Sequence, residues 1–281
     1  MVNKLILYFS SKSQQLDTVN IFRKALYVYL LFTIVQQIPV MRQLYGQHSI
    51  IVPYSFPNIS IEAAVNLLSQ TSIAEYYYLF FIAQALFCLL GLFNIMPRIS
   101  AFVIWYCTIN LNNRAYLSNT GGDLLVNILL FYLMFVSPEP KKKQGNYDTI
   151  INTFDNTFIL ALKIQVILVY AVSAIYKLIQ PEWINGSALY YILNMNEFTL
   201  PAVKQQVVHF PLLSSLCTWA VMIYQSLFPL FIFVKSLKRN LIICGIVVHL
   251  GIAIVIGLFN FSVVMICCYL LFRDESLESR V

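Results

Sequence analysis

The sequence predicts an all-α fold, a polytopic integral membrane helical bundle of about eight spans with both termini in the cytosol. Hydrophobic residues make up 59% of the 281 residues and charged residues 11%, whereas globular proteins average about 45–50% apolar and 25% charged. Apolar runs of about 17–22 residues recur along the chain. No hydrophilic stretch is long enough for a separate soluble domain, so we expect residues 1–281 to form a single transmembrane domain with a core over about 20–272.

Apolar runs bounded by helix breakers predict the individual spans. We expect helices near residues 22–41, 75–96, 98–111, 122–138, 158–179, 212–234, 240–257 and 258–272. The last two share one apolar stretch, Leu241–Phe272, which as a single helix would be about 48 Å long against a hydrocarbon core of about 30 Å. The segment GLFNFS at 257–262 is therefore predicted to break this stretch.

Basic residues predict the orientation because cytoplasmic connections of membrane proteins are enriched in lysine and arginine. With the N-terminus inside, the cytoplasmic segments carry Lys4, Lys12, Arg23, Lys24, Arg98, Lys141, Lys142, Lys143, Lys163, Lys235, Lys238, Arg239, Arg273 and Arg280. The outer segments keep Arg42, Arg114, Lys177 and Lys204. The loops near 42–74 and 180–211 are expected outside, and Lys177 at the outer end of the fifth span.

Several kinds of chemistry are disfavoured by the sequence. All six cysteines lie in predicted spans, where a thiol packs as a small apolar group, so no disulfide framework is expected. The chain lacks GxGxxG, Walker, HExxH and GxSxG motifs. Its three histidines have no ligand-spaced partner, so no metal site is predicted. The net charge of +6 follows the positive-inside pattern, so no nucleic-acid partner is expected.

Ionisable side chains inside spans are candidate functional residues because they are costly to insert. Lys177, in AIYKLIQPEWING, is near the end of its run. It either extends to the lipid headgroups or stays desolvated and acts as a general base. His249, in CGIVVHLGIAIVIG, is either a packing histidine or a group that orients or protonates a ligand.

A polar connection, NLNNRAYLSNTGGD, carries Asn112, Asn113, Arg114 and Asp123. Asp123 suits a helix N-terminus, and Arg114 can pair with Asp123 or with a lipid phosphate. Alternatively, the four residues form a polar cluster that contacts a substrate. Five tyrosines could line a pocket for a planar ring or belong to the interfacial belt: Tyr27, Tyr106, Tyr170, Tyr176 and Tyr190.

Order and spacing of motifs after residue 105 resemble those of a known family. They are NTGGDLLVNILLFYLMF, then Tyr-(x)5-Tyr-Lys-Leu-(x)2-Pro-Glu-Trp-(x)2-Gly-(x)-Ala-Leu-Tyr-Tyr at 170–191, then a span with Trp219 and Gln225, and His249-Leu-Gly251 leading to Gly257-Leu-Phe-(x)-Phe261-Ser262. Together they resemble the HTTM superfamily, whose namesake is the membrane domain of vitamin K-dependent γ-glutamyl carboxylase. A chain made of the membrane domain alone is most similar to the bacterial sporulation-delaying-protein B type.

The resemblance implies roles for individual residues. Lys177 matches the carboxylase lysine that acts as base toward vitamin K hydroquinone, and His249 matches a polar histidine of a late span. Arg114 replaces a histidine of the carboxylase pattern, and a guanidinium cannot shuttle protons as an imidazole does. Only RDESLESRV follows the last span, without the large luminal region of the carboxylases, so glutamate carboxylation is disfavoured.

The resemblance therefore implies a multi-pass protein of the bacterial plasma membrane that matures or modifies a small secreted antimicrobial-type peptide. Lys177 would be its base in an outer-leaflet pocket, His249 would help to replenish the proton, and Arg114 would hold an anionic group. Tyr176, Trp183 and Asn185 would shape the mouth of the pocket. Membrane lipids and an accessory maturation protein are further candidate partners.

Two alternative functions stay open. One is a carboxylase-like or quinone-linked oxidoreductase, for which a quinone or hydroquinone would be the cofactor. The other is a non-catalytic membrane protein for peptide binding, export or immunity that uses the outer loops.

Overall fold

Helices and the turns between them make up the parts of the chain that the computed structural model describes, residues 15–52, 66–69, 71–138, 146–195 and 210–273. No strand occurs in these ranges, which confirms the predicted all-α class. The chain divides into two units, Met1–Leu162 with Glu275–Val281, and Lys163–Asp274. Each unit is described by itself.

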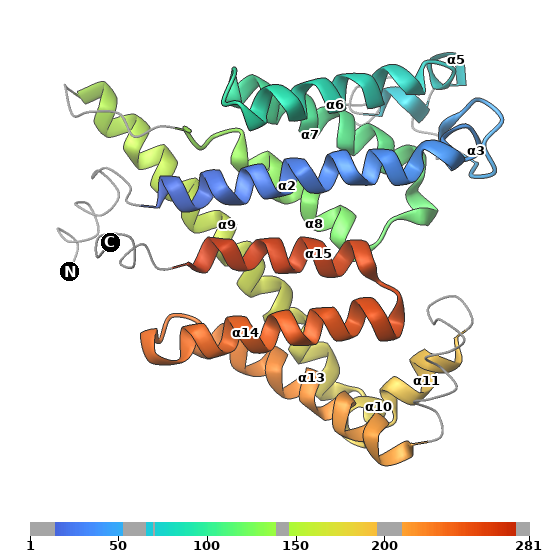
Figure 1. Ribbon diagram of the computed structural model, residues 1–281, viewed down its shortest axis with the longest axis vertical. Coiled ribbons are helices and arrows are strands. Elements are labelled where there is room, and N and C mark those ends of the chain that lie inside the picture. The colour runs from blue at the N-terminus through green and yellow to red at the C-terminus, as the bar shows by residue number, and fades with distance from the viewer. Residues whose placement is uncertain (1–14, 53–65, 70, 139–145, 196–209, 274–281) are drawn as a thin grey trace. The chain divides into compact units, whose positions relative to one another are not determined.

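The first unit is built around four neighbouring helices (Figure 1). Its helical elements are α2 (Leu16–Gln37), η1 (Ile38–Val40), α3 (Met41–Tyr45), η2 (Leu67–Ser69), α5 (Thr71–Ala74), α6 (Tyr77–Leu92), α7 (Pro97–Arg114), η3 (Tyr116–Ser118), α8 (Gly121–Leu133) and the first part of α9 (Asn146–Ile179). Helix α6 packs against α2 and α7, and α7 packs against α8. The α2–α6 contact depends on Gly91, where a Cβ atom would lie 2.4 Å from the buried Tyr27 ring.

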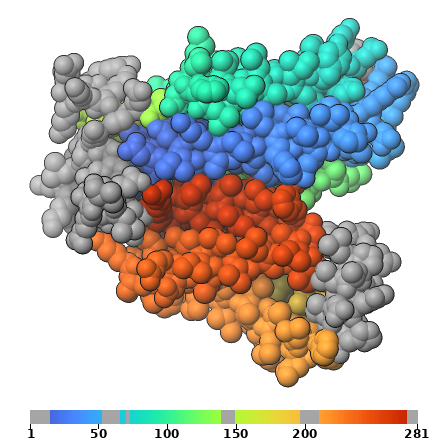
Figure 2. Space-filling model, in the orientation of Figure 1, coloured from blue at the N-terminus to red at the C-terminus, as the bar shows by residue number. Residues whose placement is uncertain are grey.

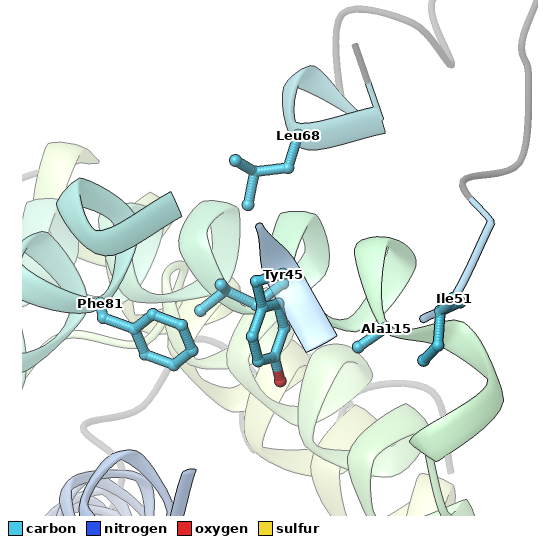
Figure 3. Packing of buried hydrophobic residues seen from close by; sticks show 6 residues of the cluster. Tyr45, Ile51, Leu68, Phe81 and Ala115 are labelled. Carbon is cyan, nitrogen blue, oxygen red and sulfur yellow. The ribbon is translucent and has the colours of Figure 1, made fainter. Parts of the chain in front are cut away.

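One apolar cluster joins the short elements of the first unit to its long helices (Figure 3). Tyr45 at the end of α3 meets Phe81 of α6 edge to face, with ring centroids 5.0 Å apart and planes at 82°. Leu68 of η2 and Ala115 after α7 belong to the same cluster and are fully buried. Burial of this apolar surface holds α3 and η2, at the two described ends of this connection, against α6 and α7.

The second unit surrounds the end of α9. Its other helical elements are α10 (Pro181–Ile184), α11 (Ala188–Asn194), α13 (Pro211–Phe231), α14 (Lys235–Gly251), the π-helix η4 (Ile252–Ile256), α15 (Phe259–Cys268) and η5 (Tyr269–Phe272). Helix α13 packs against α10, α11 and α14, and α14 packs against α15. Figure 2 shows α14 and α15 side by side on one face of this unit.

Membrane character is evident from helix length and composition in the described ranges. Four helical segments are long and apolar enough to cross a membrane: Leu16–Tyr45, Thr149–Ile179, Pro211–Phe231 and Lys235–Ile256. Shorter apolar helices occupy Tyr77–Leu92, Gly121–Leu133 and Phe259–Phe272. Many large apolar side chains on these helices are exposed, as lipid-facing surfaces require. The total of eight spans and the side of the termini stay predictions.

Two helix boundaries bear on the sequence predictions. The predicted break in the last apolar stretch is confirmed, because Gly257 adopts a left-handed conformation (φ +81°) between η4 and α15. Helix α9 begins at Asn146, before the expected residue 158. Its early turns bury Asn152 and Asp155, and the Asp155 carboxylate accepts a 2.8 Å hydrogen bond from the Ser137 backbone N–H. The Asp155 carboxylate thus has a protein donor, which lets the helix start earlier than its apolar run does.

Candidate functional site

Lys177 lies in the last turn of α9 and is half-buried. Its Nζ atom donates a 2.7 Å hydrogen bond to Ser173 Oγ, one turn earlier on the same helix. Ser173 Oγ in turn donates a 2.9 Å hydrogen bond to Oε1 of Gln225 on α13. The amine is therefore directed back along α9, which is the direction that helical side chains favour.

The indole of Trp183 lies next to the same amine, with Nζ 4.6 Å from the ring centroid. A cation over an aromatic face at this distance is stabilised by about 0.5–2 kcal/mol, more when water is excluded. Both partners of the nitrogen, the hydroxyl and the indole, are neutral. The amine therefore has neutral partners, and no carboxylate is among those that the structure gives it in the described part of the chain.

The turn after α10 holds Trp183 in place. Gly186 adopts φ +81°, and a Cβ atom there would lie 3.0 Å from Trp219 and Ser215 of α13. The Trp219 indole N–H donates a 3.0 Å hydrogen bond to the Ile184 carbonyl. Glycine thus permits both the left-handed turn and the close approach of α10 to α13.

His249 belongs to a buried hydrogen-bonded chain of three tyrosines in the second unit. Its Nε2 atom is 2.8 Å from the Tyr170 hydroxyl, which is 2.5 Å from the Tyr269 hydroxyl. The Tyr269 hydroxyl is also 2.7 Å from that of Tyr224. These side chains come from α9, α13, α14 and η5, so the chain joins the elements of the unit. His249 Nδ1 is buried and has no hydrogen-bond partner.

Close packing at this tyrosine chain requires a glycine on α14. A Cβ atom at Gly245 would lie 2.0 Å from the Tyr269 hydroxyl oxygen and 2.1 Å from that of Tyr224. Gly251, two residues after His249, has open space around the equivalent position. The two glycines that flank His249 therefore differ, and only Gly245 is required by packing.

The four predicted residues of the polar connection all lie in the first unit. Arg114 is buried, and its Nε and Nη2 atoms donate hydrogen bonds to the Tyr45 and Gly46 carbonyls at 3.2 and 2.6 Å. Its Nη1 atom is buried without a partner. The guanidinium thus caps the end of α3, where carbonyl groups lack helical partners.

Asp123 forms the expected helix start. Its carboxylate accepts hydrogen bonds from the Thr120 backbone N–H and hydroxyl, at 2.7 and 2.8 Å, in a capping box at the start of α8. Asn112 donates a 3.3 Å hydrogen bond to the Asp123 carbonyl, and Asn113 donates one to the Asn66 side chain. The hydrogen bonds of the Asp123 carboxylate go to Thr120, in place of the Arg114 pairing that the sequence left open.

A small polar cavity lies beside part of this connection. It has a volume of about 30 Å³ and is lined by Tyr29, Leu30, Thr33, Gln37, Tyr45, Gln84, Thr108, Leu111, Asn112, Asp123 and Val126. A buried water needs roughly 10–15 Å³ on the same scale. The cavity therefore accommodates one or two waters and does not fit a quinone ring.

The structure brings together only some of the predicted residues. Within the second unit, Lys177 contacts Trp183, whereas His249 bonds to Tyr170. Tyr170 precedes Lys177 by seven residues, which is about 10 Å along the axis of α9. Tyr176 is 59% exposed, and the exposed Asn185 accepts hydrogen bonds from the Ser187 backbone and hydroxyl. Both lie at the surface of this end of the unit.

Sequence reasoning missed several residues of the second unit. Ser173, four residues before Lys177, could have been found from spacing alone because residues i and i+4 of a helix are neighbours. Tyr224 and Tyr269 carried no such signal, since they meet Tyr170 only through helix packing. Among the described residues, no group of three or more His, Cys, Asp or Glu side chains lies close enough to hold a metal ion.

Comparison with known proteins relates the chain to a bacterial type. Over 188 aligned residues it is 26% identical to the sporulation-delaying protein SdpB of Bacillus subtilis (strain 168), covering 63% of this chain and 58% of SdpB. It is 27% identical over 188 residues to the uncharacterized protein YitO of the same organism, covering 60% of this chain and 58% of YitO. The chain thus spans less than two thirds of the length of both relatives. No family model and no solved structure matches it.

Proposed function

We propose that this protein is a membrane-embedded maturation or modification factor for a small secreted peptide of the antimicrobial type, located in the bacterial plasma membrane. The similarity to SdpB and the apolar helices support this proposal. The HTTM resemblance of the motifs around Lys177 and His249 is part of the same proposal. Membrane lipids surround the protein, and an accessory protein is a proposed partner.

The environment of Lys177 is the observation that carries the proposal. Its Nζ atom donates to Ser173 and lies under the Trp183 ring. A lysine near a span end can extend its four-carbon stem to the headgroups, so inward hydrogen bonding favours a role in the protein. Lys177 acts as the base toward the peptide.

The other proposed residues have separate roles, each within its own unit. His249 is proposed to tune the proton of Lys177 from a distance, because its hydrogen-bond partner Tyr170 lies about 10 Å along α9 from Lys177. In the first unit, the unpartnered Nη1 of Arg114 offers two donors to an anionic group such as a peptide carboxylate. The proposal includes no step through a quinone.

The test compares the mass of the small secreted peptide encoded beside this gene in cells with the wild-type protein and with variants. Lys177→Ala and Lys177→Arg should both abolish the mass change at unchanged expression, because arginine stays protonated and cannot act as a base. Lys235→Ala, which removes an exposed lysine of α14, is the matched control and should retain it. Full maturation with Lys177→Arg would refute the base role, and an unaltered mass without the gene would favour the binding-only function.

A further inference from the structure

Ser173 differs from three other hydroxyl residues of the helices. The hydroxyls of Thr108, Thr218 and Ser226 each donate to the carbonyl four residues earlier, at 2.7 to 2.9 Å. This is the usual way in which a helix satisfies a serine or threonine. The Ser173 hydroxyl instead donates across to Gln225 Oε1 and accepts from Lys177 Nζ. Its proton therefore belongs to a side-chain network that contains an amine.

Resting on the proposed function, we propose that Ser173 and Lys177 form a Ser–Lys dyad that cleaves a peptide bond of the secreted precursor by acyl transfer. Nucleophile and base pairs are recognised by a hydrogen bond of about 2.6–3.2 Å and by a third group that orients them. The Ser173–Lys177 distance of 2.7 Å lies in this range. Gln225, which is buried on α13, is the positioning residue.

The proposed reaction balances with one water. Neutral Lys177 Nζ takes the proton of Ser173 Oγ while this oxygen forms a bond to the carbonyl carbon of the substrate amide. The carbon–nitrogen bond then breaks, and the Lys177 ammonium returns the proton to the leaving amine. A water deprotonated by the same amine hydrolyses the acyl-serine ester, which releases the new carboxyl end and restores Ser173.

The surroundings of the dyad fit these steps. The hydroxyl can rotate between Gln225 Oε1 and a neutral Nζ without movement of the backbone. Trp183 covers the nitrogen on the side of α10, which limits its solvation by water. The half-buried Ser173 lies two turns from the end of α9, so a segment of peptide at this end of the unit could reach it.

The first experiment probes proton abstraction at position 173 without a known substrate. In the full-length protein in membranes, Ser173→Cys places a thiol beside Lys177, and its alkylation by iodoacetamide is followed by mass spectrometry. Because the thiolate is the reactive form, adding Lys177→Met should slow alkylation of this thiol about tenfold or more. Ser226→Cys, which has no amine partner, should be insensitive to Lys177→Met. Equal rates at position 173 with Lys177 and with methionine would overturn the dyad.

The second experiment separates failure of the dyad from failure of the proposed function. In cells, Ser173→Ala should abolish cleavage of the secreted precursor as completely as Lys177→Ala, and the double variant should be no worse, because residues that act as a unit are non-additive. Loss of maturation with Lys177→Ala but not with Ser173→Ala would overturn the dyad and leave the lysine base standing. Normal maturation in both single variants would overturn the dyad and the lysine base together, and normal maturation without the gene would overturn the proposed function itself.

Discussion

Removal of one hydroxyl, Tyr170→Phe, is expected to loosen the second unit. The Tyr170 hydroxyl makes two buried hydrogen bonds, at 2.8 Å to His249 and at 2.5 Å to Tyr269. Each net hydrogen bond contributes about 0.5–1.5 kcal/mol, and a buried group left unsatisfied costs about 1–3 kcal/mol. Tyr269 keeps its bond to Tyr224, whereas the His249 ring would then have no partner on either nitrogen. We therefore expect a loss of about 2–4 kcal/mol.

A buried thiol next to this network reports the loss. Cys268 is fully buried, and native-state labelling of its thiol requires local opening of the unit. A destabilisation of about 2 kcal/mol raises the labelling rate about thirtyfold when opening is a rapid pre-equilibrium. Cys88, buried in the first unit, is the internal reference and should keep its rate.

Tyr176→Phe is the matched control because Tyr176 lies on the same helix, is 59% exposed and loses the same oxygen atom. Its Cys268 labelling rate should equal that of the wild type. If Tyr170→Phe labels Cys268 no faster than Tyr176→Phe does, the buried hydrogen-bonded chain contributes no stability and this reasoning is wrong.

Three further substitutions test other contacts with the same thiol-labelling assay or with thermal unfolding in detergent. Gly245→Ala should destabilise the second unit by about 1–3 kcal/mol through overpacking, because its Cβ atom would overlap the Tyr269 hydroxyl. Gly251→Ala, the control, should leave the stability unchanged. Equal effects of the two substitutions would contradict the packing argument. Arg114→Met should lower the stability of the first unit by about 2–4 kcal/mol, because two buried carbonyls lose their donor. An unchanged midpoint of thermal unfolding would argue against capping by Arg114. Asp123→Ala should cost about 1 kcal/mol through loss of the capping box, which a midpoint equal to that of the wild type would refute.

Features that depend on the order of apolar and breaking residues could be predicted from the sequence. The all-α class, the break at Gly257 and the capping role of Asp123 follow from local patterns that need no partner. The early start of α9 could not be predicted, because Asp155 becomes compatible with a buried helix only through its hydrogen bond from the distant Ser137 backbone. In sequence, polar residues before an apolar run indicate a loop. In the structure, the Asp155 carboxylate has a hydrogen-bond donor, and the segment is part of α9.

The candidate site was predictable to a similar extent. Lys177 was evident because a charge in an apolar run is costly, and Trp183 follows it closely in sequence. Gln225 on α13 belonged to the motifs of the family resemblance, but its bond to Ser173 could not be predicted because it depends on how α9 and α13 pack. Arg114 was correctly identified as unusual, but its bonds to the Tyr45 and Gly46 carbonyls depend on a contact distant in sequence.

The length of α9 has a consequence for how the helix fits a bilayer. Its 34 residues rise about 51 Å, whereas a hydrocarbon core is about 30 Å thick. The C-terminal end is tethered, since Trp183 contacts Lys177 immediately after the helix. The surplus of about 20 Å lies at the N-terminal turns, where the buried Asp155 is hydrogen-bonded to Ser137. If the C-terminal end of α9 lies at the edge of the hydrocarbon core, these turns are therefore expected to extend beyond the opposite edge and to pack there against protein.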